Sequence, residues 1–205
     1  MNRAIVVTCI LLPSFPGSTA ACPDGLDVGE AFALVRSVDG FTERVTRTGQ
    51  DELTVERWTS APEADAPAEV VTTYRGGVYP TRRESAGRVV TSEYEALPSI
   101  TGLLPGRIVS SRFEALEGDA VIASGHEISS TDVFEPTAVR LGECDYEGLT
   151  FLTRTTIEGG ATIAFERVFV PELGYVVSAV RLDEDDEPIS GVVFDRIEAI
   201  ERDGQ

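Results

Sequence analysis

The sequence lacks lysine, and its 205 residues include one histidine and three cysteines. Without lysine, an enzyme has no side chain for Schiff-base chemistry. One histidine and so few cysteines do not supply the usual ligand set of a zinc or copper site. The sequence has no glycine-rich phosphate loop between a strand and a helix, and no G-x-S-x-G motif. We therefore expect no metal, no cofactor and no standard nucleophilic site.

Positive charge is also scarce. All 17 basic residues are arginine, against 35 acidic residues, which gives a net charge of −18. A charge of this sign and size repels nucleic acids and anionic membranes at long range. We expect no nucleic-acid partner, and instead a small ligand or another protein. The acidity and the absence of lysine fit both adaptation to salt and the codon usage of a GC-rich genome, and the sequence leaves both explanations open.

Residues 1–21 have the order of a secretion signal. Arg3 gives a positive start, residues 4–12 are mostly apolar, Pro13 breaks the run, and residues 18–21 are small. A signal peptidase recognises this order, and the apolar run is far shorter than the ~20 residues of a membrane-spanning helix. The sequence predicts a signal peptide over residues 1–21 and a single domain over residues 22–205, in the periplasm or outside the cell.

The cysteines fit this location. Cys9 belongs to the signal peptide, which leaves Cys22 and Cys144 in the mature chain. An even number of cysteines in an oxidising compartment predicts a disulfide between Cys22 and Cys144. The alternative is that Cys22 is the lipidated first residue of a lipoprotein and anchors the protein to a membrane, with Cys144 left as a free thiol.

The rest of the chain has the pattern of β-structure. Strand-like segments recur about every ten residues, with turn residues such as Asp39-Gly40 between them, which is typical of antiparallel sheets. The sequence predicts an all-β domain, a mostly antiparallel meander that forms a curved sheet, an open barrel or a sandwich. Residues 145–148 are predicted to form a turn, and Asp195–Arg202 is the one segment with short-helix character. The predicted strands are Gly29–Val38, Phe41–Arg47, Glu52–Thr59, Glu69–Tyr74, Val78–Glu84, Arg88–Tyr94, Arg107–Leu116, Ala120–Ser129, Thr137–Cys144, Leu149–Glu158, Ala161–Val170, Tyr175–Leu182 and Ile189–Ile200.

Three short stretches resemble known sequences. Residues 22–25 (CPDG), residues 144–146 (CDY) and residues 169–174 (FVPELG) resemble uncharacterised exported all-β proteins of GC-rich proteobacteria. The resemblance covers scattered turns and not the whole chain. It implies a periplasmic location and an antiparallel fold, and it implies no activity.

Residues 75–88 are the local exception to the acidic character, with four arginines and one glutamate. The planar guanidinium group suits phosphate and carboxylate recognition. We predict that this segment contacts a ligand or a partner through Arg75, Arg82, Arg83, Arg88 and Tyr79. The alternative is an exposed hairpin whose arginines pair with surface acids. An apolar loop, residues 97–106, follows shortly after this segment.

Two other groups suggest chemistry less specifically. His126 is the only imidazole, and Ser124 or Ser129 would complete a triad with it; the favoured interpretation is a half-buried strand histidine. The acidic run Asp183–Glu187 resembles a Ca²⁺ loop in composition only, because it lacks the glycine and the ligand spacing of one. We interpret it as a solvated hairpin tip.

The leading hypothesis is therefore a non-catalytic binding protein for a small apolar or anionic ligand. A curved antiparallel sheet can enclose such a ligand, with the cavity mouth near residues 97–106 and the arginine-rich segment. The second hypothesis is a cell-envelope structural or interaction protein with a filled core and a protein partner. The third is a hydrolase that works with paired carboxylates.

Overall fold

The computed structural model describes residues 22–63, 66–97, 108–130 and 136–200, and every helix or strand within them is a β-strand. The predicted signal peptide and nearly all of the apolar loop at residues 97–106 lie outside the described residues. Nothing in the described chain is helical, long and apolar enough to cross a membrane. The all-β prediction is confirmed.

Fourteen strands follow one another along the described residues, and most lie where alternation and turn residues predicted them. The first six are β1 (Ala31–Arg36), β2 (Phe41–Arg47), β3 (Glu52–Trp58), β4 (Val70–Arg75), β5 (Tyr79–Ser85) and β6 (Arg88–Tyr94). The next four are β7 (Ile108–Glu117), β8 (Ala120–Ser130), β9 (Thr137–Leu141) and β10 (Cys144–Ile157). The last four are β11 (Thr162–Val170), β12 (Tyr175–Leu182), β13 (Pro188–Val193) and β14 (Arg196–Ile200).

These strands form one antiparallel sheet in the order β13-β12-β11-β10-β8-β7-β6-β5-β4-β3-β2-β1-β14. The long strand β10 has two partners on one side: residues 144–148 pair with β9, and residues 152–157 pair with β8. The sheet does not close into a barrel, because β13 and β14 lie at its two ends. Of the three predicted architectures, the structure is the curved open sheet.

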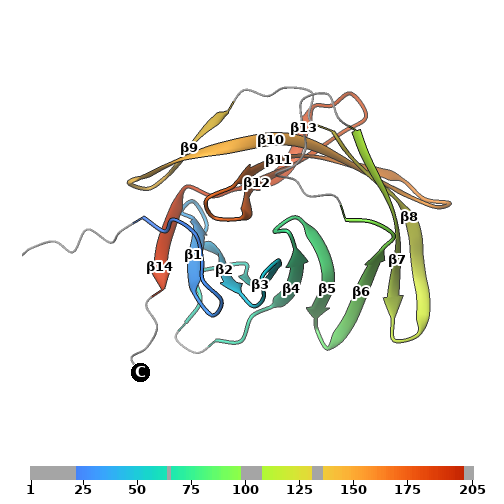
Figure 1. Cartoon of the computed structure of the whole chain (residues 1–205), viewed down its shortest axis with the longest axis horizontal. Coiled ribbons are helices and arrows are strands. Elements are labelled where there is room, and N and C mark those ends of the chain that lie inside the picture. The colour runs from blue at the N-terminus through green and yellow to red at the C-terminus, as the bar shows by residue number, and fades with distance from the viewer. Residues whose placement is uncertain (1–21, 64–65, 98–107, 131–135, 201–205) are drawn as a thin grey trace, which may run out of the picture.

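The sheet curls so strongly that its two halves face each other (Figure 1). Strands β10–β13 lie across the concave face formed by β1–β5. Side chains from both halves fill the space between them, including Phe32, Leu34 and Val45 from one half and Val170 and Leu173 from the other. Burial of these apolar side chains, at about 1.5–3 kcal/mol each, holds the two halves together.

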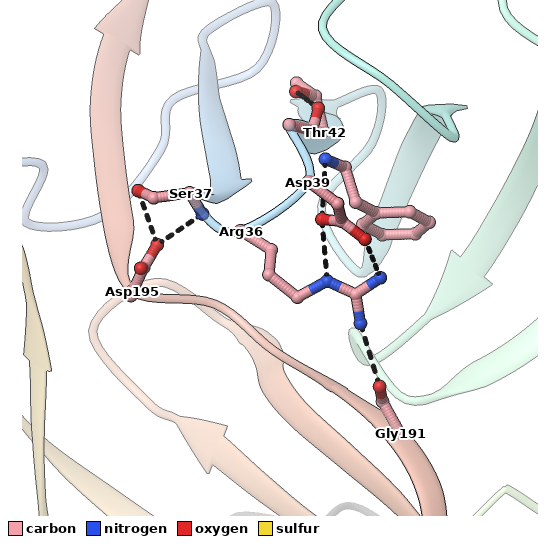
Figure 2. A network of polar contacts seen from close by, with 8 residues as sticks. Arg36, Ser37, Asp39, Thr42, Gly191 and Asp195 are labelled. Carbon is pink, nitrogen blue, oxygen red and sulfur yellow. Dashed lines mark hydrogen bonds and ion pairs between the residues drawn. The ribbon is translucent and has the colours of Figure 1, made fainter.

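A polar network joins the ends of the sheet where β13 leads into β14 (Figure 2). Arg36, at the end of β1, forms a two-pronged ion pair with Asp39 and donates a hydrogen bond to the carbonyl of Gly191 in β13 at 2.9 Å. The carboxylate of Asp195 accepts hydrogen bonds from the backbone N–H and the hydroxyl of Ser37, each at 2.9 Å. These hydrogen bonds lower the pKa of both Asp39 and Asp195.

Cys22 and Cys144 form the predicted disulfide, which spans 122 residues and ties the segment before β1 to the start of β10. A disulfide fits an oxidising location outside the cytoplasm.

Two local predictions are wrong. Residues 145–148 continue strand β10, because Gly142, with φ of +67°, turns the chain earlier and lets residues 144–148 pair with β9. Arg196–Ile200 is a strand and not a helix, because the open edge of β1 offers its backbone groups to β14, and Ile197 pairs with Leu34 there.

Candidate functional site

The inner face of the sheet carries charged residues within apolar stripes. On β2, Glu43 lies between Phe41 and Val45, and all three side chains are buried. Arg57 on β3 and Arg167 on β11 occupy similar positions beside apolar residues. Successive side chains of a strand point to opposite faces of the sheet, so every second residue shares a face. These charged side chains therefore point, like their apolar neighbours two residues away, into the interior between the two halves of the sheet.

Glu43 is the centre of a buried hydrogen-bonded group. The antiparallel register places it directly opposite Arg57, whose Nε and Nη2 both donate to Glu43 Oε1, the first at 2.7 Å. The hydroxyl of Tyr175 donates to Glu43 Oε2 at 2.9 Å. Burial alone would lower the pKa of Arg57, but the Glu43 carboxylate outweighs burial and raises it. Burial, assisted by Glu43, holds the pKa of Tyr175 well above its ordinary value.

A cavity of about 290 Å³ lies beside this group, between β2–β5 and β11–β13. Arg57, Arg83 and Arg167 line it, and Glu43 is the only carboxylate among its lining residues. Since Glu43 pairs with Arg57, no carboxylate of the lining pairs with Arg83 or Arg167. Glu127 on β8, which is not a lining residue, interacts electrostatically with Arg167. On a protein of net charge −18, this cavity is a local centre of positive charge.

The rest of the cavity wall is largely apolar or aromatic. Arg167 stacks over the ring of Phe165 at 5.4 Å, and its Nη1 donates to the carbonyl of Val78 at 3.4 Å. Within the described chain, Arg83 forms no side-chain hydrogen bond or ion pair, and it is exposed, so it stands at the solvent side of the cavity. The apolar and aromatic lining includes Tyr74, Pro80, Phe165, Val176, Val192 and Phe194.

The structure does not bring the five predicted contact residues together. Alternation along β5 sends Arg83 towards the cavity, whereas Arg82 lies on the outer face and pairs with Glu84 at 3.0 Å. Arg75 is exposed at the end of β4. Tyr79 is 2% exposed and packs edge-on against Tyr94, with ring centroids 5.7 Å apart. Arg88 forms an exposed ion pair with Glu117 at 2.7 Å.

Sequence reasoning missed Glu43, Arg57, Arg167 and Tyr175. A usable signal was present for the first three: each is a charged residue at an inward position of a strand whose other inward residues are apolar. In a strand, such a residue must be paired or functional. Tyr175 gave no comparable signal, because a tyrosine within an apolar strand is ordinary core composition.

The triad suggested by His126 does not form. Ser124 and His126 lie on the outer face of β8, and Ser129 is buried on the inner face. The Ser124 hydroxyl donates to Glu158 Oε2 at 2.8 Å and so does not donate to the imidazole. His126 is exposed rather than half-buried.

The acidic hairpin tip is held by its own backbone. Asp183 Oδ1 accepts hydrogen bonds from the N–H groups of Asp185 and Glu187, each at 2.9 Å, and Asp186 pairs with Arg154. In the part of the chain that the structure describes, no cluster of three or more His, Cys, Asp or Glu residues is placed to hold a metal.

A second hollow of about 350 Å³ lies on β6 and β7. Its charged lining consists of Glu93, Glu95 and Glu114 with the single Arg112. This excess of negative charge is opposite to that of the first cavity, so the second hollow does not suit an anion.

No protein-family model, no curated protein and no solved structure matches this chain. The geometry of the site therefore carries the functional argument alone.

Proposed function

We propose that this protein works outside the cytoplasm as a non-catalytic binding protein for a small ligand with an apolar body and an anionic group. The observation that carries the proposal is the cavity between β2–β5 and β11–β13, whose lining contains no carboxylate paired with Arg83 or Arg167. The cavity volume of about 290 Å³ is near the lower limit of small-molecule pockets, about 300 Å³, which favours a small ligand.

The arginines and the apolar wall of the cavity would bind different parts of the ligand. Arg83, exposed and without a side-chain partner in the described residues, would meet the anionic group at the cavity mouth. Guanidinium groups bind carboxylates and phosphates with paired hydrogen bonds. Phe165, Val192 and Phe194 supply apolar contact for the remainder of the ligand.

Isothermal titration calorimetry with decanoate tests this proposal, with decanol as the neutral probe. In the Arg83→Ala variant we expect decanoate affinity to fall about tenfold, which corresponds to about 1.4 kcal/mol, and decanol binding to stay the same. Arg82→Ala is the matched control, because it removes the neighbouring arginine from the opposite face. Absence of decanoate binding, or equal losses in the two variants, would contradict the proposal.

A second function is favoured by an exposed apolar patch on the outer face of the β7–β8 hairpin. Ile108 is 71% exposed and Ile128 39%. The register places Ile108 and Ile128 near each other, since their partners Ser130 and Ser110 belong to the same ladder. Exposed apolar groups on one face are typical of protein contacts, and they support an envelope interaction protein as the alternative.

A further inference from the structure

Five buried polar side-chain atoms have no hydrogen-bond partner in the described part of the chain, and one of them is Arg47 Nε on β2. The other four are the Tyr79 hydroxyl, Glu127 Oε1, Thr153 Oγ1 and Arg167 Nε, here called the polar cluster. Tyr79 is 2% exposed, Glu127 6% and Thr153 0%. Buried polar atoms are nearly always paired in folded proteins, because an unpaired one lowers stability. Four such atoms in one region indicate a binding site for a polar group of a ligand.

Three members of the polar cluster come from adjacent strands. Glu127 on β8 lies opposite Thr155 on β10, and the Thr155 hydroxyl donates to Glu127 Oε2 at 3.2 Å. Thr153 is the next inward residue along β10. Arg167 on β11 lies opposite Phe151, one further inward position along β10. Glu127, Thr153 and Arg167 therefore form a diagonal row across three neighbouring strands of the inner face.

Tyr79 reaches the same row from the opposite wall. It shares one buried cluster with Phe151, which brings β5 against β10. Burial raises the pKa of Tyr79 to about 12; the nearby Ser129 hydroxyl lowers it, the charge of Glu127 raises it and that of Arg167 lowers it. Burial also raises the pKa of Tyr94, with the same two charges acting on it. Both tyrosines therefore lie within electrostatic reach of Glu127 and Arg167.

The available atoms define the group that would fit. Glu127 Oε1 needs a donor, whereas the N–H at Arg167 Nε needs an acceptor, and the Tyr79 and Thr153 hydroxyls can do either. A hydroxyl group both donates and accepts, so a single one can donate to Glu127 Oε1 and accept from Arg167 Nε and from one of the two hydroxyls. A second carboxylate would meet the negative charge of Glu127, and a methylene group would leave all four atoms unpaired.

We propose that the polar cluster binds a hydroxyl group of the ligand, so that the ligand class is a hydroxylated aliphatic acid. The inference rests on the proposed function, because Arg167 belongs both to the polar cluster and to the lining of the cavity. The ligand's hydroxyl donates to Glu127 Oε1 and accepts from Arg167 Nε, while its acid group lies at Arg83. The shared arginine links the two ends of one binding site.

Calorimetry with decanoate, 3-hydroxydecanoate and 10-hydroxydecanoate tests this inference, since the two hydroxy acids place the hydroxyl near either end of the chain. We expect one of them to bind at least about tenfold more tightly than decanoate, because a site built for a hydroxyl discriminates against the analogue that lacks it. Tyr79→Phe and Thr153→Val each remove one hydroxyl of the polar cluster, and we expect both to reduce this preference.

The same variants have a readout without ligand. Because each removes an unpaired buried hydroxyl, we expect the Tm of the free protein to stay the same or rise. Tyr146→Phe is the matched control: the Tyr146 hydroxyl donates to the carbonyl of Pro23 at 2.9 Å, so its removal should lower the Tm and leave the ligand preference unchanged.

The outcomes separate the two proposals. Equal binding of decanoate and both hydroxy acids would overturn the hydroxyl inference and leave the proposed function standing. A preference that survives in both Tyr79→Phe and Thr153→Val, or a lower Tm in both, would also overturn the inference. Absence of binding by all three acids would overturn the proposed function, and the inference with it.

Discussion

At the scale of single residues, the interior holds ionic groups where a β-sheet ordinarily buries apolar side chains. The Glu43 side chain is 4% exposed and that of Arg57 27%. Replacing a buried ion pair with apolar residues of similar volume is often neutral or stabilising, so stability alone does not account for this pair. Its geometric effect is clear: Glu43 holds the Arg57 guanidinium and the Tyr175 hydroxyl along the cavity wall.

Arg57→Met tests how strongly this group depends on charge balance. Without Arg57, the Glu43 carboxylate remains buried and uncompensated, and we expect the free energy of unfolding to fall by about 3 kcal/mol. Urea denaturation followed by tryptophan fluorescence measures this change. Arg88→Met is the control; it breaks the exposed pair with Glu117, and exposed pairs contribute little, so its midpoint should match the wild type.

The double variant Glu43→Gln/Arg57→Met provides the second comparison. Because the amide carries no charge, we expect this variant to recover part of the stability lost in Arg57→Met. Two results would show that Glu43 is not held as a buried carboxylate. One is that Arg57→Met is as stable as the wild type, and the other is that Glu43→Gln/Arg57→Met is less stable than Arg57→Met.

At the scale of elements, the β4–β5 hairpin positions one wall of the cavity. Its turn contains Gly76 and Gly77, with φ of +59° and +71°, a region that favours glycine. The two glycines are equivalent as turn residues, but their surroundings differ. A Cβ on Gly77 would overlap the backbone carbonyl of Gly174 in the turn after β11, whereas a Cβ on Gly76 would meet nothing within 4 Å. The hairpin therefore packs against that turn through Gly77.

Gly77→Ala and Gly76→Ala separate packing from backbone conformation. Both variants pay for the left-handed backbone, about 1–2 kcal/mol. Gly77→Ala also forces the hairpin away from Gly174, and we expect it to cost at least about 1 kcal/mol more. Thermal unfolding of the two variants measures the difference. Equal losses of stability would mean that the hairpin and the turn do not pack closely.

At the scale of the whole molecule, one covalent link ties the segment before β1 to the start of β10. In the described structure, β1 and β10 are distant along the sheet order, and they come together only because the sheet curls. The Cys22–Cys144 disulfide spans 122 residues and includes most of the strands. It therefore restricts the unfolded chain over most of its length.

Cys22→Ser/Cys144→Ser measures the contribution of this link. In the chain-entropy model a loop of this length stabilises the folded state by about 4–5 kcal/mol. We expect the double variant to unfold at a lower urea concentration than the oxidised wild type, and the reduced wild type to behave like the variant. Dithiothreitol should leave the variant unchanged. If reduction of the wild type does not shift its midpoint, the disulfide does not contribute to stability.

Local patterns in the sequence were sufficient to predict the class of fold. Strand positions follow from alternating side chains, and turns such as Asp39-Gly40 follow from residues that accept positive φ. The disulfide followed from the even number of cysteines outside the predicted signal peptide. The errors arose where pairing with a distant strand decided the outcome: β1 draws Arg196–Ile200 into a strand, and β9 extends β10 back to Cys144.

The candidate site was much less accessible to sequence reasoning. Charge clustering along the chain selected Arg83, which lines the cavity, but it also selected Arg82, which alternation places on the other face. Arg167 is more than a hundred residues from Glu43 and from Arg57 in the sequence, and the three residues carry no shared motif. Alternation shows which residues share a face of one strand, but not which strand lies across from it.

The sequence by itself determined the strands, the turns between them, the antiparallel connections and the acidic surface, because each depends on residues close together in the chain. Only the tertiary structure decided that the sheet curls until β11 faces β3 and β5. That curl places Arg167 beside the Glu43–Arg57 pair and opposite Tyr79. The physical reason is that the curvature arises from apolar burial between the two halves of the sheet, which is a property of the folded whole.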